Sequence, residues 1–343
     1  MSEAEKRSLA NIEYSVIVPL IAKMVNGKWF SKIQKIGEAT YRLKIGSENL
    51  IIWLGKALFL SSKREFMVSE DQFCNRINKA LRNSKLVSFF QLGHDRIIVL
   101  EFRDKKLIIE QFGKGNIILC DSGDRILDCM REEQWSSRKI KKNEQYVSPP
   151  TLAFPSTSED FQEFLISREK DYLVVALSRL PIGITYVKKV LAKLGLAEQS
   201  KPSEVSPEHI KTLYYELAGL FSKPKPLAVI VGDQIVEFYL VDVGEGEANL
   251  DALLLLEQYY SPCLDSLGKQ DNKKQGIEIQ KKALEAKIAD NLLIAREIEQ
   301  NLAELEQIAA RVKNGEKKGE SLHYFFEMDY SKGLLKIKRR EKQ

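Results

Sequence analysis

The chain has 343 residues, which at roughly 150 residues per domain predicts two or three domains with a substantial buried core. Hydrophobic residues make up 44% and charged residues 29% of it, proportions that exclude a disordered or fibrous chain. The net charge of +5 permits a polyanionic partner without requiring one.

The N-terminal part of the chain has an α+β pattern. Apolar residues recur at four-residue spacing between residues 9 and 24, which predicts an amphipathic helix that Asn26-Gly27 closes as a turn. A second helix is predicted from Ser69-Glu70-Asp71, which offers an N-cap with acidic residues in the first turn. Eight short runs bounded by turn residues predict antiparallel strands at residues 29–36, 41–45, 50–53, 57–61, 86–92, 96–102, 106–112 and 116–121. We therefore assign residues 1–155 to an antiparallel, β-rich domain.

Proline- and serine-rich segments between residues 148 and 158 mark a boundary, after which the pattern becomes helical. We assign residues 156–224 to a helical domain. Within it, Pro181, Ile182 and Gly183 separate two predicted helices and resemble the hairpin of a helix-hairpin-helix element, in which backbone amides at a helix N-terminus bind phosphate. A tight turn between two helices explains the same residues equally well.

Two strands and a short helix follow in residues 225–270, which we expect to return to the first domain. Apolar residues from 277 to 312 then alternate at four- and three-residue spacing over about five heptads, the pattern of a coiled coil. At 1.5 Å per residue this arm is roughly 50 Å long. Residues 271–343 are thus predicted to form a coiled-coil arm with a basic tail.

Two groups of residues are candidates for binding nucleic acid. Asp95 and Arg96 lie side by side at a predicted strand-turn-strand tip, where arginine can bind phosphate or a base edge through two parallel hydrogen bonds. An ordinary turn with a solvated arginine is the alternative. Arg138 and Lys139 begin a basic stretch that is a possible phosphate site or simply a solvated loop.

The sequence contains no pattern typical of a catalytic or metal centre. The four cysteines form no C-x-x-C pair and the three histidines lie far apart, so we expect neither a zinc site nor a disulfide framework. We also expect no cofactor and no catalytic residues. With no secretory signal or membrane span expected, the chain is predicted to be cytoplasmic, with reduced thiols.

The run from Phe90 to Leu100, with Asp95-Arg96 at its centre, and the following Gly113-Lys114-Gly115-Asn116 closely resemble the NFACT proteins, which include bacterial RqcH, eukaryotic NEMF and archaeal relatives. Residues 173–196 look like the family's helix-hairpin-helix segment, and residues 277–312 look like its coiled coil. The resemblance runs through nearly the whole chain. Its closing stretch, residues 322–343, does not resemble the family's second RNA-binding domain, so we expect a fragment or a truncated relative.

The resemblance implies a non-enzymatic, RNA-binding factor of ribosome-associated quality control. Such a factor binds stalled large ribosomal subunits with peptidyl-tRNA and recruits tRNA for C-terminal tailing of the nascent chain. The match places Asp95 and Arg96 at the family's tRNA-binding pair, and Glu13 where many relatives carry an aspartate. Because a single helix cannot cover its own apolar stripe and no return helix is evident, we also expect a homodimer or a separate C-terminal partner chain bound through the coiled coil, or else an arm that is disordered in isolation.

The sequence leaves two alternative functions, a DNA-repair protein and a surface adhesin. A DNA-glycosylase-like repair protein is the main alternative, because the NFACT N-terminal domain is similar to the glycosylase N-terminal fold. Those enzymes use an N-terminal proline amine and a zinc finger, whereas this sequence begins Met1-Ser2 and lacks the finger. A fibronectin-binding surface adhesin conflicts with the expected absence of a secretion signal.

Overall fold

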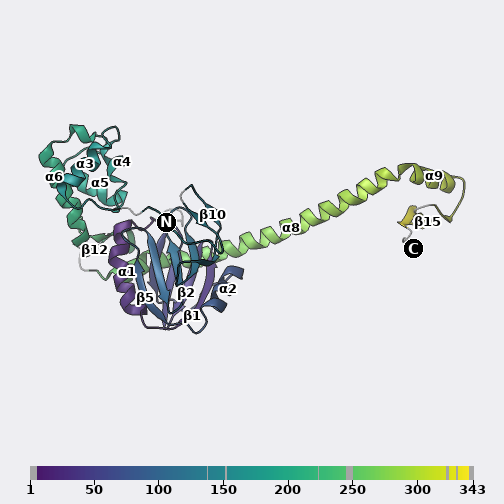
Figure 1. Ribbon diagram of the computed structural model, residues 1–343. Coiled ribbons are helices and arrows are strands. Elements are labelled where there is room, and N and C mark those ends of the chain that lie inside the picture. The colour runs from purple at the N-terminus through teal and green to yellow at the C-terminus, as the bar shows by residue number, and fades with distance from the viewer. Residues whose placement is uncertain are drawn as a thin grey trace. The chain divides into compact units, whose positions relative to one another are not determined.

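The computed structural model describes residues 6–136, 138–150, 153–222, 224–244, 250–321, 324–329 and 331–339 (Figure 1). The chain divides into two compact units, residues 1–272 and 273–343. The first unit contains two antiparallel sheets and a group of helices, which confirms the predicted α+β class with antiparallel sheets.

The first sheet is a four-stranded antiparallel meander. Helix α1 (Asn11–Val25) precedes it, and helix α2 (Gln72–Ala80) follows it and packs on β1. Asp71, within the predicted capping segment, caps α2 by accepting a hydrogen bond of 2.8 Å from the backbone N–H of Cys74. The first turn contains none of the expected acidic residues, because the helix begins after them. The strands, connected by tight turns, are β1 (Phe30–Gly37), β2 (Thr40–Ile45), β3 (Glu48–Trp53) and β4 (Ala57–Ser61).

The second sheet is a five-stranded meander, and its first strand packs on α1 (Figure 1). Its strands are β5 (Leu86–Gln91), β6 (Ile97–Phe102), β7 (Lys105–Glu110), β8 (Asn116–Asp121) and β9 (Ile126–Cys129). The small hairpin of β10 (Glu133–Gln134) and β11 (Lys139–Ile140) follows it. Strands β9, β10 and β11 are too short to give a clear alternating pattern, so the sequence analysis missed them.

Helices of the predicted helical region share a second apolar core around Phe161, Leu177, Tyr186 and Leu213. Helices α4 and α5 are in contact and lie on the two sides of residues 181–183. The helix-hairpin-helix assignment stays a prediction. The helices of this group are α3 (Ser158–Ile166), α4 (Leu173–Leu177), α5 (Ile184–Lys193) and α6 (Pro207–Gly219), with short 3₁₀ turns η2 (Pro202–Glu204) and η3 (Leu220–Ser222).

A β-hairpin connects the two cores of this unit, and a helix follows it. Strands β12 (Pro224–Val231) and β13 (Gln234–Val241) pair with each other. Phe238 and Leu240 of β13 belong to the core of the first sheet, whereas Tyr239 and Val241 belong to the helical core. Alternate residues of one strand therefore serve both cores. Helix α7 (Ala252–Tyr260), with the 3₁₀ turn η4 (Ser261–Cys263) after it, packs against β4 and β13.

The long helix α8 (Leu264–Gln300) contains the boundary between the two units, and α9 (Leu302–Lys313) follows it. The predicted continuous helix from 277 to 312 is thus broken at Asn301, whose backbone leaves the helical conformation. Three strands, β14 (Lys318–Glu320), β15 (Tyr324–Asp329) and β16 (Leu334–Arg339), form a sheet. Its Tyr324 and Phe326 bury Ile308 of α9. Coiled-coil pairing stays a prediction.

Candidate nucleic-acid interface

The turn between β5 and β6 carries Asp95 and Arg96, and hydrogen bonds fix its shape. Gly93 has a positive φ of 58°, which allows the tight turn. The Asp95 carboxylate accepts hydrogen bonds from the Arg96 backbone N–H (2.7 Å) and from Nδ2 of Asn11 (3.4 Å). The Gln91 side chain donates to the carbonyl of Asp95 at 2.8 Å. The carboxylate therefore orders the turn and ties it to the first residue of α1.

The guanidinium of Arg96 is half-buried and keeps its hydrogen-bonding capacity. Its Nε is shielded from solvent without a hydrogen-bond partner, and no hydrogen bond or ion pair connects the guanidinium to any residue in the described part of the chain. Burial raises the pKa of Tyr14, and the positive charge of Arg96 partly offsets this effect. The terminal N–H groups of an arginine in this state can donate to an external acceptor.

Glu13 is fully buried in α1 and lies in a network of hydrogen bonds. Its carboxylate pairs with the guanidinium of Arg7, with one contact of 2.8 Å, and accepts the backbone N–H of Ala10 at 2.7 Å. The Tyr186 hydroxyl donates to it at 2.7 Å and accepts the N–H of Leu240 at 2.9 Å. Glu13 thereby connects α1 to α5 and to β13.

The ion pair between Arg7 and Glu13 also changes the pKa of Arg7. Burial alone would lower the pKa of Arg7, but the adjacent Glu13 carboxylate outweighs that effect and holds the pKa above its ordinary value. Arg7 further donates to the carbonyl of Phe238 at 2.6 Å and lies 3.8 Å over the ring of the same residue. Both ions are thus neutralised inside the protein.

The hairpin of Pro181, Ile182 and Gly183 packs against the start of α1. Pro181 and Ile182 are buried, and the carbonyl of Ile182 accepts the N–H of Ile12 at 3.4 Å. Gly183 caps α5 with a φ of 110°, and a Cβ atom at this position would lie 2.5 Å from the Cβ of Ala10. Only glycine fits this backbone conformation and this close approach.

Arg138 and Lys139 differ in exposure. Arg138 is buried and forms a two-bond ion pair with Glu110, one bond being 3.0 Å long, while Tyr146 donates to the same carboxylate at 2.9 Å. Lys139 is exposed and pairs with Glu144 at 2.7 Å. The basic stretch is therefore not a uniform solvated loop, because its first arginine belongs to the interior.

The structure brings several predicted residues to one end of the second sheet. Asn11 connects the Asp95 turn to α1, and Ile182 contacts the same end of α1. The carbonyl of Arg96 accepts the N–H of Gln111, and Ile97 pairs with Glu110, the partner of Arg138. Sequence reasoning missed Asn11, because its contacts with His94 and Gln91 span 80 or more residues and leave no local pattern.

In the described part of the chain, no group of three or more His, Cys, Asp or Glu side chains is arranged to hold a metal ion. Among the same residues, no helix has the length and apolarity that crossing a membrane requires.

The family model described as the NFACT N-terminal and middle domains matches residues 17–329. The chain belongs to the NFACT family. Among its relatives, the archaeal Rqc2 homolog aRqcH of Methanocaldococcus jannaschii is 26% identical over 289 residues, which cover 76% of this chain and 42% of that protein. The ribosome quality control complex subunit 2 of Saccharomyces cerevisiae is 25% identical over 135 residues, covering 37% of this chain and 13% of the relative.

The NFACT chain thus spans less than half the length of these curated relatives. Among solved structures, the fibrinogen binding protein from Staphylococcus aureus has a similar fold. The two match with a TM-score of 0.58 and 16% identity, over 73% of this chain and 98% of that one. At this level of identity the likeness concerns the fold alone.

Proposed function

We propose that this NFACT chain is a non-enzymatic, RNA-binding factor of ribosome-associated quality control in the cytoplasm. It binds large ribosomal subunits that carry peptidyl-tRNA and takes part in recruiting tRNA for C-terminal tailing of the nascent chain. The names of its relatives support the ribosome quality control role in general. The observation that carries the RNA contact is the half-buried, unpartnered guanidinium of Arg96.

Arg96 suits an RNA contact for an energetic reason. A guanidinium held partly away from water has already lost part of its hydration, and among the described residues it has no partner that compensates. A phosphate or a guanine edge supplies two acceptors in the geometry of the guanidinium. Asp95 contributes by fixing the turn, since its carboxylate bonds to the Arg96 N–H and to Asn11.

The other predicted residues take supporting roles in this proposal. Glu13 acts as a positioning residue, because its buried carboxylate holds the start of α1 against Tyr186. The hairpin of Pro181, Ile182 and Gly183 presents the N-terminus of α5 beside α1, where its first amides can bind a phosphate. Lys139 is exposed for a further phosphate contact, whereas Arg138 is a buried partner of Glu110.

Co-sedimentation tests this function directly. We expect the chain to migrate with free large ribosomal subunits and not with intact ribosomes. Binding to tRNA should weaken steeply as salt rises, because contacts with phosphate release counterions. A chain that excises damaged bases, or that borohydride traps on DNA as a covalent adduct, would establish the glycosylase alternative instead.

An arginine comparison tests the site. Arg96→Ala should weaken tRNA binding by about 1–3 kcal/mol, the range for one bidentate arginine contact. Arg103→Ala is the matched control, since Arg103 is an exposed arginine in the turn between β6 and β7 at the opposite end of the same sheet. Equal losses from both substitutions would indicate general electrostatics and not a site at Arg96.

A further inference from the structure

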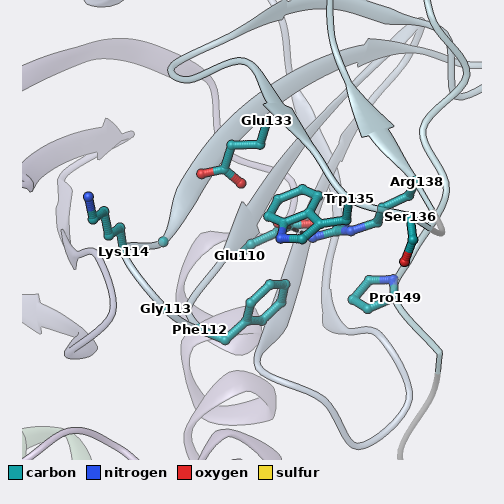
Figure 2. A pocket seen from close by; sticks show the side chains of 10 residues that line it. Glu110, Phe112, Gly113, Lys114, Glu133, Trp135, Ser136, Arg138 and Pro149 are labelled. Carbon is teal, nitrogen blue, oxygen red and sulfur yellow. Dashed lines mark hydrogen bonds and ion pairs between the residues drawn. The ribbon is translucent and has the colours of Figure 1, made fainter.

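A pocket of about 510 Å³ opens beside the loop between β7 and β8. Phe112 and Trp135 flank it, with Glu133 and Lys114 on one side and Ser136 and Pro149 on the other (Figure 2). Its volume lies in the range of small-molecule sites, about 300–1,000 Å³. Of the residues that line it, only Arg138 was predicted as a site residue from the sequence.

The polar groups of the pocket are already neutralised. Both oxygens of Glu110 accept hydrogen bonds from Arg138, and Tyr146 donates to one of them. The Arg138 guanidinium lies 4.5 Å from the ring centroid of Trp135 and 5.5 Å from that of Phe112. The two aromatic rings therefore already interact with one cation, which disfavours a second cation as ligand.

The remaining surface suits a flat, uncharged ring. Trp135 is 43% exposed although it is a large aromatic side chain, and Phe112 is half-buried. Aromatic faces of this kind stack on nucleobases with little regard to sequence. Lys114 is exposed at the rim, and its ammonium has no hydrogen bond or ion pair within the described residues, so it can bind the phosphate attached to a stacked base.

The pocket also lies next to the proposed RNA contact. Glu110 pairs with Ile97 in the ladder between β6 and β7, and Gln111 donates its backbone N–H to the carbonyl of Arg96. The loop that supplies Phe112 and Lys114 therefore follows directly on residues bonded to the Arg96 turn. One RNA strand can reach both places.

We propose that this pocket binds one unpaired nucleobase of the RNA, with the base stacked on Trp135 and Phe112 and its phosphate at Lys114. This inference rests on the proposed RNA-binding function, and it adds a site for a single-stranded base to the arginine contact. It also assigns Arg138 to the wall of the pocket, where it supports Trp135, and not to direct phosphate binding.

Two probes of equal length test the proposal, a ten-nucleotide oligoadenylate and a ten-nucleotide abasic ribose-phosphate strand. Trp135→Ala and Phe112→Leu should weaken binding of the oligoadenylate about tenfold and leave binding of the abasic strand unchanged. Lys114→Ala should weaken both probes. Trp29→Ala is the matched control, because Trp29 is 58% exposed and lies beside Lys85, away from the pocket.

The proposal is wrong if Trp135→Ala leaves oligoadenylate binding intact or weakens both probes equally while the variant keeps its melting temperature. A Trp29→Phe chain provides a second measurement that needs no change in the pocket. It retains the buried Trp53 and the exposed Trp135, so adenosine monophosphate should quench its fluorescence, and absence of quenching also counts against the site. If binding depends on the base but the chain does not co-sediment with large subunits, the nucleobase site is supported and the proposed function is wrong.

Discussion

The hydroxyl of Tyr186 in α5 donates a 2.7 Å hydrogen bond to the carboxylate of Glu13 in α1, across 173 residues of sequence. Burial raises the pKa of Tyr186 well above its ordinary value, so the hydroxyl keeps its proton and stays a donor over the whole physiological range. The same oxygen accepts the N–H of Leu240. One phenol thus joins the first helix, the helical group and the returning hairpin.

We expect Tyr186→Phe to destabilise the chain by about 1–3 kcal/mol, because it leaves the buried N–H of Leu240 without its acceptor and removes a donor from Glu13. Urea denaturation monitored by circular dichroism measures this change. Tyr215→Phe is the control, since Tyr215 is 59% exposed and should change stability little. Equal stability of the two variants would contradict a structural role for the phenol.

Glu13→Gln separates a positioning role from direct contact with RNA. Removing the charge leaves the partly buried cation of Arg7 without its carboxylate, which should cost about 1–3 kcal/mol of stability. We expect loss of tRNA affinity and a fall in melting temperature together, with a smaller fall for Glu13→Asp, which keeps the charge. A Glu13→Gln variant that loses tRNA affinity with an unchanged melting temperature would instead place the carboxylate in contact with RNA.

The buried thiols make stability fall at alkaline pH. Burial raises the pKa of Cys74 to about 12, from an ordinary value of 9.0. Above pH 9 the unfolded chain therefore loses a proton that the folded chain keeps, and the free energy of unfolding decreases as pH rises. Denaturation curves at successive pH values should show a shallower decrease for Cys74→Ala than for the unsubstituted chain. Parallel pH profiles would refute this assignment.

Helix α8 exposes Leu284, Ile288 and Leu292, each more than half accessible. A helix with an apolar stripe is stabilised by covering it, and a second copy of the chain supplies the same stripe. We expect association that increases with concentration in sedimentation velocity, and we expect Leu284→Lys with Ile288→Lys to abolish it. Ile166→Lys, at an exposed isoleucine of α3, serves as the control. A strictly monomeric chain with a protease-resistant α8 would contradict the expectation.

The longer strands of the two main sheets and the capping segment before α2 could be predicted because their signals are local. Asp71 lies three residues before the N–H that it caps, and the strands of both sheets alternate with turn residues. Arg138 shows the opposite case. Its basic neighbours suggested a solvated loop, but its partner Glu110 lies 28 residues away in sequence, on a strand that pairs with β6.

The candidate site divides in the same way. Asp95 and Arg96 could be singled out because their residue types and the turn around them are both evident within six consecutive residues. The sequence could not predict that Arg96 has no partner or that Asn11 bonds to Asp95, because both depend on how α1 packs against β5. The break of the predicted helical arm at Asn301 was also missed, and beyond it Leu305 and Val312 pack on the last sheet.

The bonds of Arg7 constrain the order of events during synthesis of the chain. Its guanidinium binds the carbonyl of Phe238, and its own carbonyl accepts the hydroxyl of Tyr260, at separations of 231 and 253 residues. While a ribosome is making the chain, Arg7 emerges long before its partners, and its charge stays hydrated until β13 and α7 have left the exit tunnel. Folding of this unit therefore finishes only after Tyr260 has left the tunnel, and nascent chains cut short before Tyr260 lack the contacts that hold Arg7.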